Sequence, residues 1–224
     1  YQQLHNFGQK TGIDLPGETT GIVYGDRMTT IDAACNSFGQ TINVNMMQMM
    51  AAYCSIINGG MLYQPHIVKR IESANGEVVK EYKANLVRQT ITASTSKLLR
   101  RYLKNTVEEG TAKKAGVTGY SVAGKTRTAQ KGDRKDNKWI ISFIGHAPAE
   151  NPKFAIYVVI DEPYGTTGTS GSSADVLTLT HNILEKLLPY MNVYKDASDE
   201  YEDTSSSPDE LTVDGIPAGT ASSN

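Results

Sequence analysis

Cysteine is scarce in this sequence, and no apolar run is long enough to cross a membrane. The 224 residues include two cysteines, Cys35 and Cys54, which are too few for a disulfide framework and lack metal-ligand spacing. No stretch approaches the roughly 18 to 20 apolar residues of a membrane span. The start, Tyr1-Gln2-Gln3, has no signal-peptide character and no Met, so we expect a fragment or processed chain whose targeting segment lies upstream. A hydrophobic share of 39% fits a globular body.

Basic residues are absent from the end of the chain. From Asp196 onward there are eight of the 24 acidic residues and no Lys or Arg, so residues 1–195 hold 22 basic and the remaining 16 acidic residues. An acidic, Ser-rich stretch without apolar periodicity cannot bury enough surface to offset its ordering entropy. We therefore predict one folded body over residues 1–190 and a disordered tail over 191–224. The basic residues of the body are scattered rather than arranged in a stripe, and we expect no nucleic-acid partner.

Apolar periodicity predicts a mixed arrangement of helices and strands. Helices are indicated at 44–57, starting after Thr41 or Asn43, at 92–109, starting at Thr92 or Ser94, and at 172–189, where Ser172 and Asp175 offer a capping box. The methionines of the first helix would suit a flexible binding groove, but at helical spacing they are predicted to fill the core. Asn75-Gly76 favours a tight hairpin between 66–71 and 77–82. Residues 8–25 read as loop.

Three further strand-like runs lie close together, at 120–126, 138–144 and 153–160. The links between them are too short for a helical crossover, so the strands should pair antiparallel as a meander. The third run is apolar on both faces, which is typical of a central, covered strand. The predicted fold class is α/β in the mixed α+β sense, an antiparallel sheet flanked by helices. The 172–189 helix covers one face, and the methionine-rich helix or the 92–109 helix covers the other.

The most informative segment carries a Lys-Thr pair inside a strand: Ser121-Val122-Ala123-Gly124-Lys125-Thr126-Arg127-Thr128-Ala129-Gln130. It resembles the Lys-Thr-Gly strand of penicillin-binding proteins. Three residues alone are weak support, but further segments resemble the same family in the same order. They are 7–18, Ser37-Phe38-Gly39-Gln40, Asn58-Gly59-Gly60, 65–71, 107–115 and Ser142-Phe143-Ile144-Gly145-His146-Ala147-Pro148.

This resemblance implies the transpeptidase and serine β-lactamase-like fold, incomplete at the N-terminus. The family forms an acyl-serine intermediate from the D-alanyl-D-alanine end of a peptidoglycan stem peptide. By resemblance, Lys125 is a catalytic cation, Thr126 and Thr128 bind the substrate carboxylate, and the Thr128 backbone N–H is an oxyanion donor. Arg127 stands where the family has glycine, within the substrate-binding strand. A guanidinium adds bulk and charge there, which leaves a weakened enzyme and an inactive relative both open.

The nucleophile is expected upstream of Tyr1 rather than in this chain. Ser94 and Lys97 spell Ser-x-x-Lys, but they lie where the family has an ordinary helix start, and Ser94 is better explained as an N-cap. Ser222-Ser223-Asn224 spells Ser-x-Asn inside the acidic tail. The widely separated histidines indicate no metal site, and no cofactor is implied. The Gly/Thr/Ser-rich loop at 165–171 lacks a phosphate-loop ending and is expected to form a rim of the cleft. The histidines are His5, His66, His146 and His181.

The expected function is part of a D,D-transpeptidase that cross-links peptidoglycan and binds β-lactams. The alternative is a non-catalytic binding or scaffold protein of the cell-wall machinery, with Arg127 blocking turnover. Expected partners are the stem peptide, β-lactams, the missing N-terminal half of the same domain, and cell-wall or divisome proteins. The resemblance also implies a location on the extracytoplasmic side of a bacterial cytoplasmic membrane, with an anchor in a segment absent from this chain.

Overall fold

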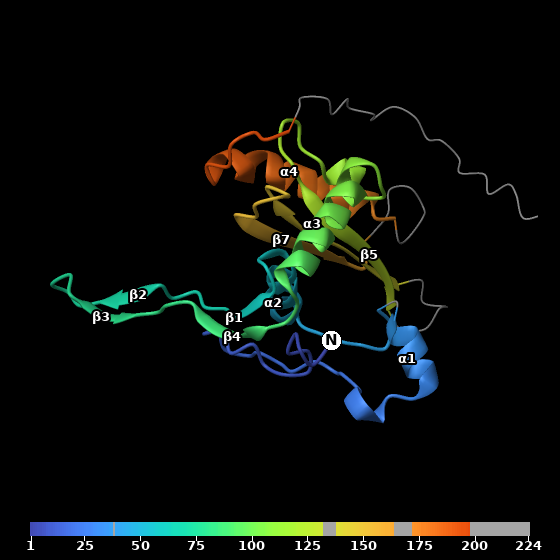
Figure 1. Ribbon diagram of the computed structural model, residues 1–224, viewed down its shortest axis with the longest axis horizontal. Coiled ribbons are helices and arrows are strands. Elements are labelled where there is room, and N and C mark those ends of the chain that lie inside the picture. The colour runs from blue at the N-terminus through green and yellow to red at the C-terminus, as the bar shows by residue number, and fades with distance from the viewer. Residues whose placement is uncertain (38, 132–137, 164–171, 198–224) are drawn as a thin grey trace, which may run out of the picture.

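Three consecutive antiparallel strands form the sheet at the centre of the protein. The computed structural model describes residues 1–37, 39–131, 138–163 and 172–197 (Figure 1). The strands are β5 (Ala123–Lys131), β6 (Lys138–Ala147) and β7 (Phe154–Asp161), in the spatial order β5-β6-β7. The predicted meander is confirmed. Around it lie η1 (Gly25–Arg27), α1 (Thr30–Ser37), α2 (Met46–Ile57), α3 (Ala93–Glu108), η2 (Lys113–Ala115) and α4 (Ala174–Tyr190).

Helices cover both faces of this sheet. On one face, Ile141 and Phe143 of β6 belong to a single buried cluster with Val107 of α3. The α4 side chains Val176, Leu177, Leu184 and Leu188 complete that cluster. The opposite face of β6 meets α2, where the Tyr53 hydroxyl lies 2.7 Å from the Nδ1 atom of His146. The two predicted covers are therefore confirmed, with α3 and α4 sharing one cluster and α2 on the other side.

The prediction that the third run is the central strand is wrong for the described residues. β6 is central, while β7 pairs only with β6 in the part of the chain that the structure describes. Each β7 residue from Phe154 to Ile160 is half-buried rather than buried. Apolar residues on both faces of a strand report that both faces are covered, and they do not report how many neighbours pair along its edges.

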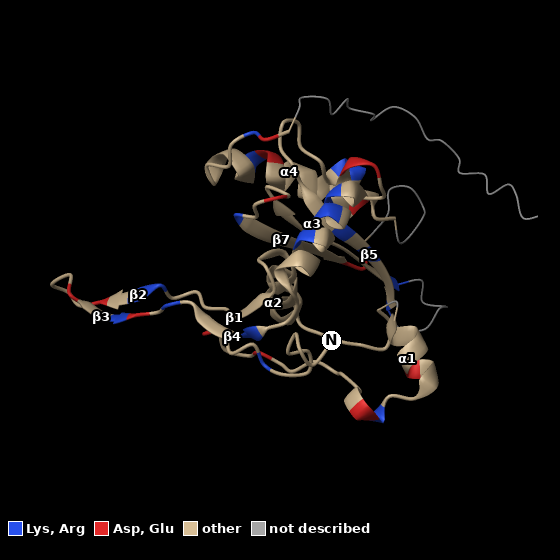
Figure 2. Cartoon of the chain, viewed as in Figure 1, with Lys and Arg blue, Asp and Glu red and all other residues tan. Residues whose placement is uncertain are grey.

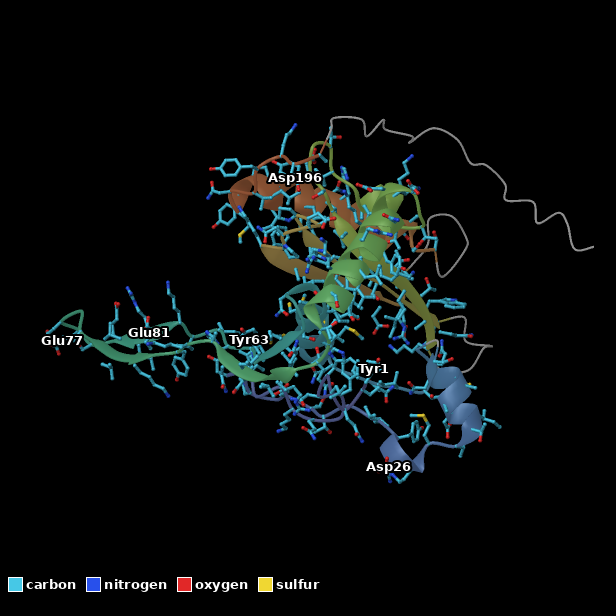
Figure 3. The ribbon with its side chains drawn as sticks, in the orientation of Figure 1. Tyr1, Asp26, Tyr63, Glu77, Glu81 and Asp196 are labelled. Atoms are coloured by element: carbon cyan, nitrogen blue, oxygen red, sulfur yellow. The ribbon has the colours of Figure 1, made fainter. Side chains whose placement is uncertain are left out.

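A long two-stranded arm projects from the body (Figure 1). Its outer part is the predicted hairpin, formed by β2 (Arg70–Glu72) and β3 (Val78–Glu81) around Gly76, whose φ is 82°. Its inner part pairs β1 (Met61–Gln64) with β4 (Asn85–Gln89). The sequence predicted the hairpin but not β1, β4 or α1. Figure 3 shows Glu77 and Glu81 far out on the arm and Tyr63 near its base.

The caps of two helices differ from those predicted. The N-cap of α2 is Asn45, which forms a reciprocal capping box with Gln48, and not Thr41 or Asn43. The N-cap of α3 is Thr92, whose side chain accepts from the Thr95 N–H, so Thr92 is the correct one of the two candidates. An Asx or Thr side chain takes this role only where the local backbone lets it reach an unpaired N–H.

The predicted capping box at the start of α4 is wrong. Ser173 occupies the N-cap position without a side-chain hydrogen bond there. Ser172 instead accepts a hydrogen bond of 3.2 Å from the Ala174 N–H, two residues on. One residue of displacement is enough to lose the box, because the Ser and the acidic residue must stand three positions apart on the first turn.

The methionines of α2 are not core residues, contrary to prediction. Met46 is 50% exposed, and Met47, Met49 and Met50 are half-buried. The buried residues of this helix are Gln48, Ala52, Tyr53, Ser55 and Ile57. Gln48 is buried because its side-chain amide donates to the carbonyls of Gln9 and Thr20, at 2.6 and 2.9 Å. A polar residue thus ties α2 to the loop before it, while the methionine side stays partly open.

The first residues of the predicted tail belong to the folded body. Val193 is 4% exposed and joins the main core cluster. The Asp196 carboxylate accepts from the backbone N–H of Ser121 at 2.7 Å and also from the Ser121 hydroxyl. Residues 191–197 are therefore ordered, contrary to the expected start of the tail, and residues 198–224 lie outside the described residues.

Close packing fixes the junction of β5 and β6. Gly124 and Gly145 are direct cross-strand partners, and the Phe143 ring lies over both. A Cβ atom on Gly124 would lie 2.3 Å from Cζ of Phe143 and 2.6 Å from the Ile144 carbonyl oxygen, and one on Gly145 would lie 2.5 Å from Cε1 of the same ring. Neither position has room for a side chain.

We predict that Gly124→Ala destabilises the protein by about 1 to 3 kcal/mol, because an added methyl group in a filled core forces its neighbours to shift. Thermal unfolding of the purified protein measures the effect. Gln130→Ala on the same strand is the matched control and should stay within about 0.5 kcal/mol of the parent. Equal stability of both variants would contradict the packing described for Phe143.

A buried histidine predicts a pH effect. The Nε2 atom of His146 lies 3.1 Å from the carbonyl oxygen of Ala149, which can only accept, so Nε2 carries the proton and Nδ1 accepts from the Tyr53 hydroxyl. Burial lowers the pKa of His146 to about 4, with a smaller contribution in the same direction from the positive charge of Arg100. Burial also raises the pKa of Tyr53.

Between pH 6.5 and about 4, an unfolded His146 takes up a proton that the folded one does not. Stability should therefore be complete above pH 6.5 and fall as the pH drops through that window, by about 3 kcal/mol. Urea unfolding at several pH values measures the slope. We expect His146→Gln to lower stability at pH 7 and flatten the slope, while the exposed His66→Gln leaves it unchanged. A slope that survives in His146→Gln would rule out His146 as its source.

Candidate active site

The four sequence-predicted site residues lie together on β5, an edge strand of the described sheet. Lys125 and Thr128 are exposed, and Thr126 and Arg127 are half-buried. None is packed in the core, as side chains that meet a ligand require. The Nζ atom of Lys125 lies 3.1 Å from the carbonyl oxygen of Thr126. No ion pair to Lys125 is found among the described residues, so its positive charge stands without a carboxylate there.

The register of β5 and β6 assigns the site residues to two faces. Lys125 and Arg127 stand opposite Ile144 and Ser142, whereas Thr126 and Thr128 stand opposite Phe143 and Ile141. Lys125 and Arg127 thus lie on the α2 side of the sheet, and the two threonines lie on the side of the core cluster. Because β5 is at the edge of the described sheet, a ligand bound along the outer edge of this strand can meet side chains of both faces.

The last lysine of the strand differs from Lys125. The Nζ atom of Lys131 lies 2.9 Å from a carboxylate oxygen of Asp161 and 3.0 Å from one of Glu162. The hydrogen bonds that Lys131 donates to these two carboxylates raise its pKa. The charge of Lys131 is therefore neutralised by two neighbouring carboxylates, whereas no ion pair to Lys125 is found among the described residues.

Arg127 reaches across to a distant part of the chain. Its guanidinium donates to the carbonyl oxygen of Gly39, in the turn that follows α1. An added Cβ on Gly39 would lie 3.5 Å from Cζ of Arg127, so the two segments are in contact. Arg127 therefore binds backbone, and no ion pair from its guanidinium to a carboxylate is found among the described residues. A further long-range hydrogen bond to this region joins Gln2 to Asn36.

Polar side chains of α3 hold both the start of β5 and the end of α2, and the sequence did not predict these contacts. The Thr106 hydroxyl at the end of α3 donates to the Gly124 carbonyl. Ser96 and Arg100 of α3 hold the end of α2, since Ser96 donates to the Ile56 carbonyl at 2.6 Å and Arg100 donates to that of Ile57 at 2.8 Å. A cation at a helix C-terminus also complements the helix dipole. No spacing in the sequence links these residues, which lie about 40 positions apart.

The remaining sequence candidates do not form a second site. Ser94 and Lys97 are exposed in the first turn of α3, and the Ser94 hydroxyl lies 2.9 Å from that of Thr92. His5 and His181 have hydrogen-bond partners, the Ser55 hydroxyl and the Gly116 carbonyl, at 3.0 and 2.6 Å. Within the described ranges, no group of three potential metal ligands occurs, and both cysteines are free thiols. The loop at 165–171 and residues 222–224 lie outside those ranges.

A hollow in the described surface lies away from β5. It has a volume of about 210 Å³ and is lined by residues of the loop before α2 and of its first turn: Ile13, Leu15, Pro16, Gly17, Glu18, Thr19, Asn45, Met46 and Met47. It contains none of the four site residues. Over the described residues, no helix is both long and apolar enough to cross a membrane.

Comparison with known proteins identifies the family. The model of the penicillin-binding protein transpeptidase domain matches residues 1–185. Stage V sporulation protein D of Bacillus subtilis is 41% identical over 198 residues, which cover 86% of this chain and 30% of that protein. The probable peptidoglycan D,D-transpeptidase PenA of Neisseria meningitidis is 32% identical over 173 residues, covering 72% of this chain and 28% of that protein.

Solved structures agree in fold. A crystal structure of penicillin-binding protein 3 from Mycobacterium tuberculosis, complexed with ampicillin, superimposes with a TM-score of 0.78 at 31% identity, covering 89% of this chain and 46% of that one. The mixed fold of an antiparallel sheet flanked by helices is thus the one the resemblance implied. The chain spans about a third of the length of the curated relatives it matches. From the match over residues 1–185, the chain belongs to the penicillin-binding protein transpeptidase domain family.

Proposed function

We propose that this chain supplies the substrate-strand half of a serine D,D-transpeptidase site, as the C-terminal portion of the transpeptidase domain. The observation that supports this best is the exposed Lys125, which has no ion-pair partner among the described residues, inside the family motif on a strand at the edge of the described sheet. An extended peptide can bind along such an edge as an added strand would. The relative named a peptidoglycan D,D-transpeptidase and the structure with bound ampicillin point to the same chemistry.

The proposed reaction is acyl transfer through a serine supplied by chain upstream of Tyr1. The serine oxygen attacks the carbonyl carbon of the D-alanyl-D-alanine amide, the amide bond breaks, and terminal D-alanine leaves after accepting a proton. An amine of a neighbouring stem then attacks the ester and releases the serine. A β-lactam would acylate the same serine by opening its ring.

Each site residue has a role in this proposal. Lys125 attracts the substrate carboxylate, because its charge has no carboxylate partner among the described residues, and it assists the proton transfer. The Thr126 and Thr128 hydroxyls bind the same carboxylate. The Thr128 N–H is one of two donors to the developing oxyanion, a contribution of about 3 kcal/mol to lowering the barrier.

Arg127 leaves two functional outcomes, and its contact with Gly39 favours an intact site. The guanidinium is tied to the Gly39 carbonyl in the turn after α1, so its position is fixed by that turn. We propose that the site stays accessible and that Arg127 borders it on the α2 side. The alternative function, a non-catalytic scaffold protein of the cell-wall machinery, requires this side chain or the turn it holds to block the cleft.

The rest of the domain would cover the apolar surface that this chain leaves open. The half-buried β7 offers an unpaired edge within the described residues. On α4, Leu179 and Ile183 are 42% and 36% exposed, one turn apart. We propose the N-terminal half of the same domain as the partner that covers them. By the same family argument, the intact protein would act outside the cytoplasmic membrane, anchored upstream, together with cell-wall or divisome proteins.

Labelling of the complete protein with a fluorescent penicillin tests the proposed function. We expect a covalent adduct, and we expect Lys125→Ala to slow its formation about 100-fold, since a hydrogen bond to a charged group contributes about 1.5 to 3 kcal/mol. Lys131→Ala is the matched control on the same strand and should label at the parental rate. Arg127→Gly should label at least as fast as the parent.

The alternative function, a non-catalytic scaffold protein, predicts a different result in the same labelling experiment. A parent protein that does not label, together with an Arg127→Gly variant that does, would support the scaffold function and reject ours. Labelling that is unaffected by Lys125→Ala would reject the role assigned to that lysine.

The proposal that the rest of the domain covers α4 predicts that a polar substitution on the exposed face of this helix destabilises the complete protein. Ile183→Asp should destabilise the complete protein by about 2 to 3 kcal/mol, the loss expected for a buried apolar side chain. Val79→Asp on the arm, where Val79 is 67% exposed, should change stability by less than about 0.5 kcal/mol. Thermal unfolding of both variants decides this, and equal effects would show that Ile183 stays in solvent.

A further inference from the structure

The outer face of α3 carries a row of basic side chains. Lys97, Arg101 and Lys104 are spaced four and three residues apart, which places them on one side of the helix. Lys97 and Arg101 are exposed, and Lys104, 30% exposed, lies 3.5 Å from Glu108. Figure 2 shows positive residues along the helix and negative ones only at its final end. The net charge of this face is therefore positive over most of its length.

Two large apolar side chains lie beside the basic row. Leu98 and Tyr102 are 43% and 53% exposed and stand one turn apart. The side of the helix that faces the core carries Ser96 and Val107, which are fully buried. Basic and apolar rows on one exposed face match a partner that combines carboxylates with apolar side chains, because each row then gains a complementary contact.

The chain itself contains a segment of that chemistry. Residues 199–214 include seven acidic residues and no Lys or Arg, and the acids fall into two clusters. The first cluster surrounds Tyr201, and the second surrounds Leu211 and Val213. The rest of the body carries the opposite net charge, so this segment is the complement of the α3 face within the same chain.

The described chain just before this segment is tied to the residues that lead into β5. Asp196 is held by Ser121, and its N–H donates to the Gly119 carbonyl at 3.0 Å, just before β5. Thr106, in the last turn of α3, bonds to Gly124 at the start of the same strand. Figure 3 shows Asp196 on the body of the protein, at the side opposite to Asp26. The last described residues before the segment are therefore anchored to the chain that leads into β5, the strand that α3 contacts.

Length does not limit the contact. At about 3.3 Å per extended residue, residues 199–214 reach about 50 Å, while the helix is about 24 Å long. Tethering also raises the effective concentration of the segment to roughly millimolar, so weak charge pairs suffice for binding. The helix dipole favours carboxylates toward the start of α3, and Glu108 disfavours them at its end.

We propose that residues 199–214 dock on the outer face of α3, running from its C-terminal end toward Lys97. The acidic clusters pair with Lys97, Arg101 and Lys104, and the apolar residues between the acids cover Leu98 and Tyr102. This inference is independent of the proposed acyl transfer, because it uses none of the site residues.

Lysine footprinting of the complete protein tests the docking. Acetylation of Lys97 should be at least about threefold slower when the segment is present than in a variant with 199–214 deleted, at about 50 mM salt. The difference should vanish at about 500 mM salt, because screening removes exposed charge pairs. Equal rates at low salt would overturn the proposal.

A synthetic peptide of residues 198–214 provides the second measurement. It should bind the deletion variant, and the combined change Lys97→Glu, Arg101→Glu and Lys104→Glu should weaken binding by at least about tenfold. The control, Lys69→Glu, Lys80→Glu and Lys83→Glu on the arm, makes the same change in net charge and should stay within about twofold. Equal loss in both would indicate non-specific attraction and reject the site. Binding of anionic phosphatidylglycerol vesicles that needs the α3 residues, with no peptide binding, would assign this face to a lipid surface instead.

Discussion

The Phe143 ring, lying over two facing glycines, is the constraint on which the position of the site strand depends. Gly124 and Gly145 have no side chains, so the Phe143 ring can lie over both of them where β5 and β6 pair. The strand that follows Gly124 then presents Lys125 and Arg127 to one side and Thr126 and Thr128 to the other. The position of this strand therefore depends on Gly124 as well as on the lysine and the two threonines, because a side chain at position 124 has no room.

Sequence patterns predicted the elements whose signals are local. The three antiparallel strands, the Asn75-Gly76 hairpin and the three longer helices follow from alternation, turn residues and helical spacing. The missed or misplaced features depend on distant parts of the chain. α1 buries no residue, so no apolar period marks it. Likewise, the end of the folded body was set too early, because Val193 and Asp196 are fixed by partners that the acidic composition around them does not reveal.

The candidate site shows the same division. The motif around Lys125 identified the strand and the family, and the exposure of its residues agrees with a ligand-facing role. The sequence did not reveal that Arg127 binds a carbonyl 88 positions away, or that Lys131 is neutralised while Lys125 is not. Both depend on which segments the fold brings next to β5. The basic face of α3 is a related case, because the sequence shows its lysines and arginine, whereas only the fold shows that this side of the helix is exposed.

Arg127 has one more consequence, which concerns local motion rather than chemistry. None of the described residues of α1 is buried, and long-range hydrogen bonds from Gln2 and Arg127 reach this helix and the turn after it. A segment with few buried contacts opens at a small fraction of the free energy needed to unfold the whole protein. A substitution at position 127 would therefore change how often the neighbouring helix detaches, while leaving the pairing of the sheet untouched.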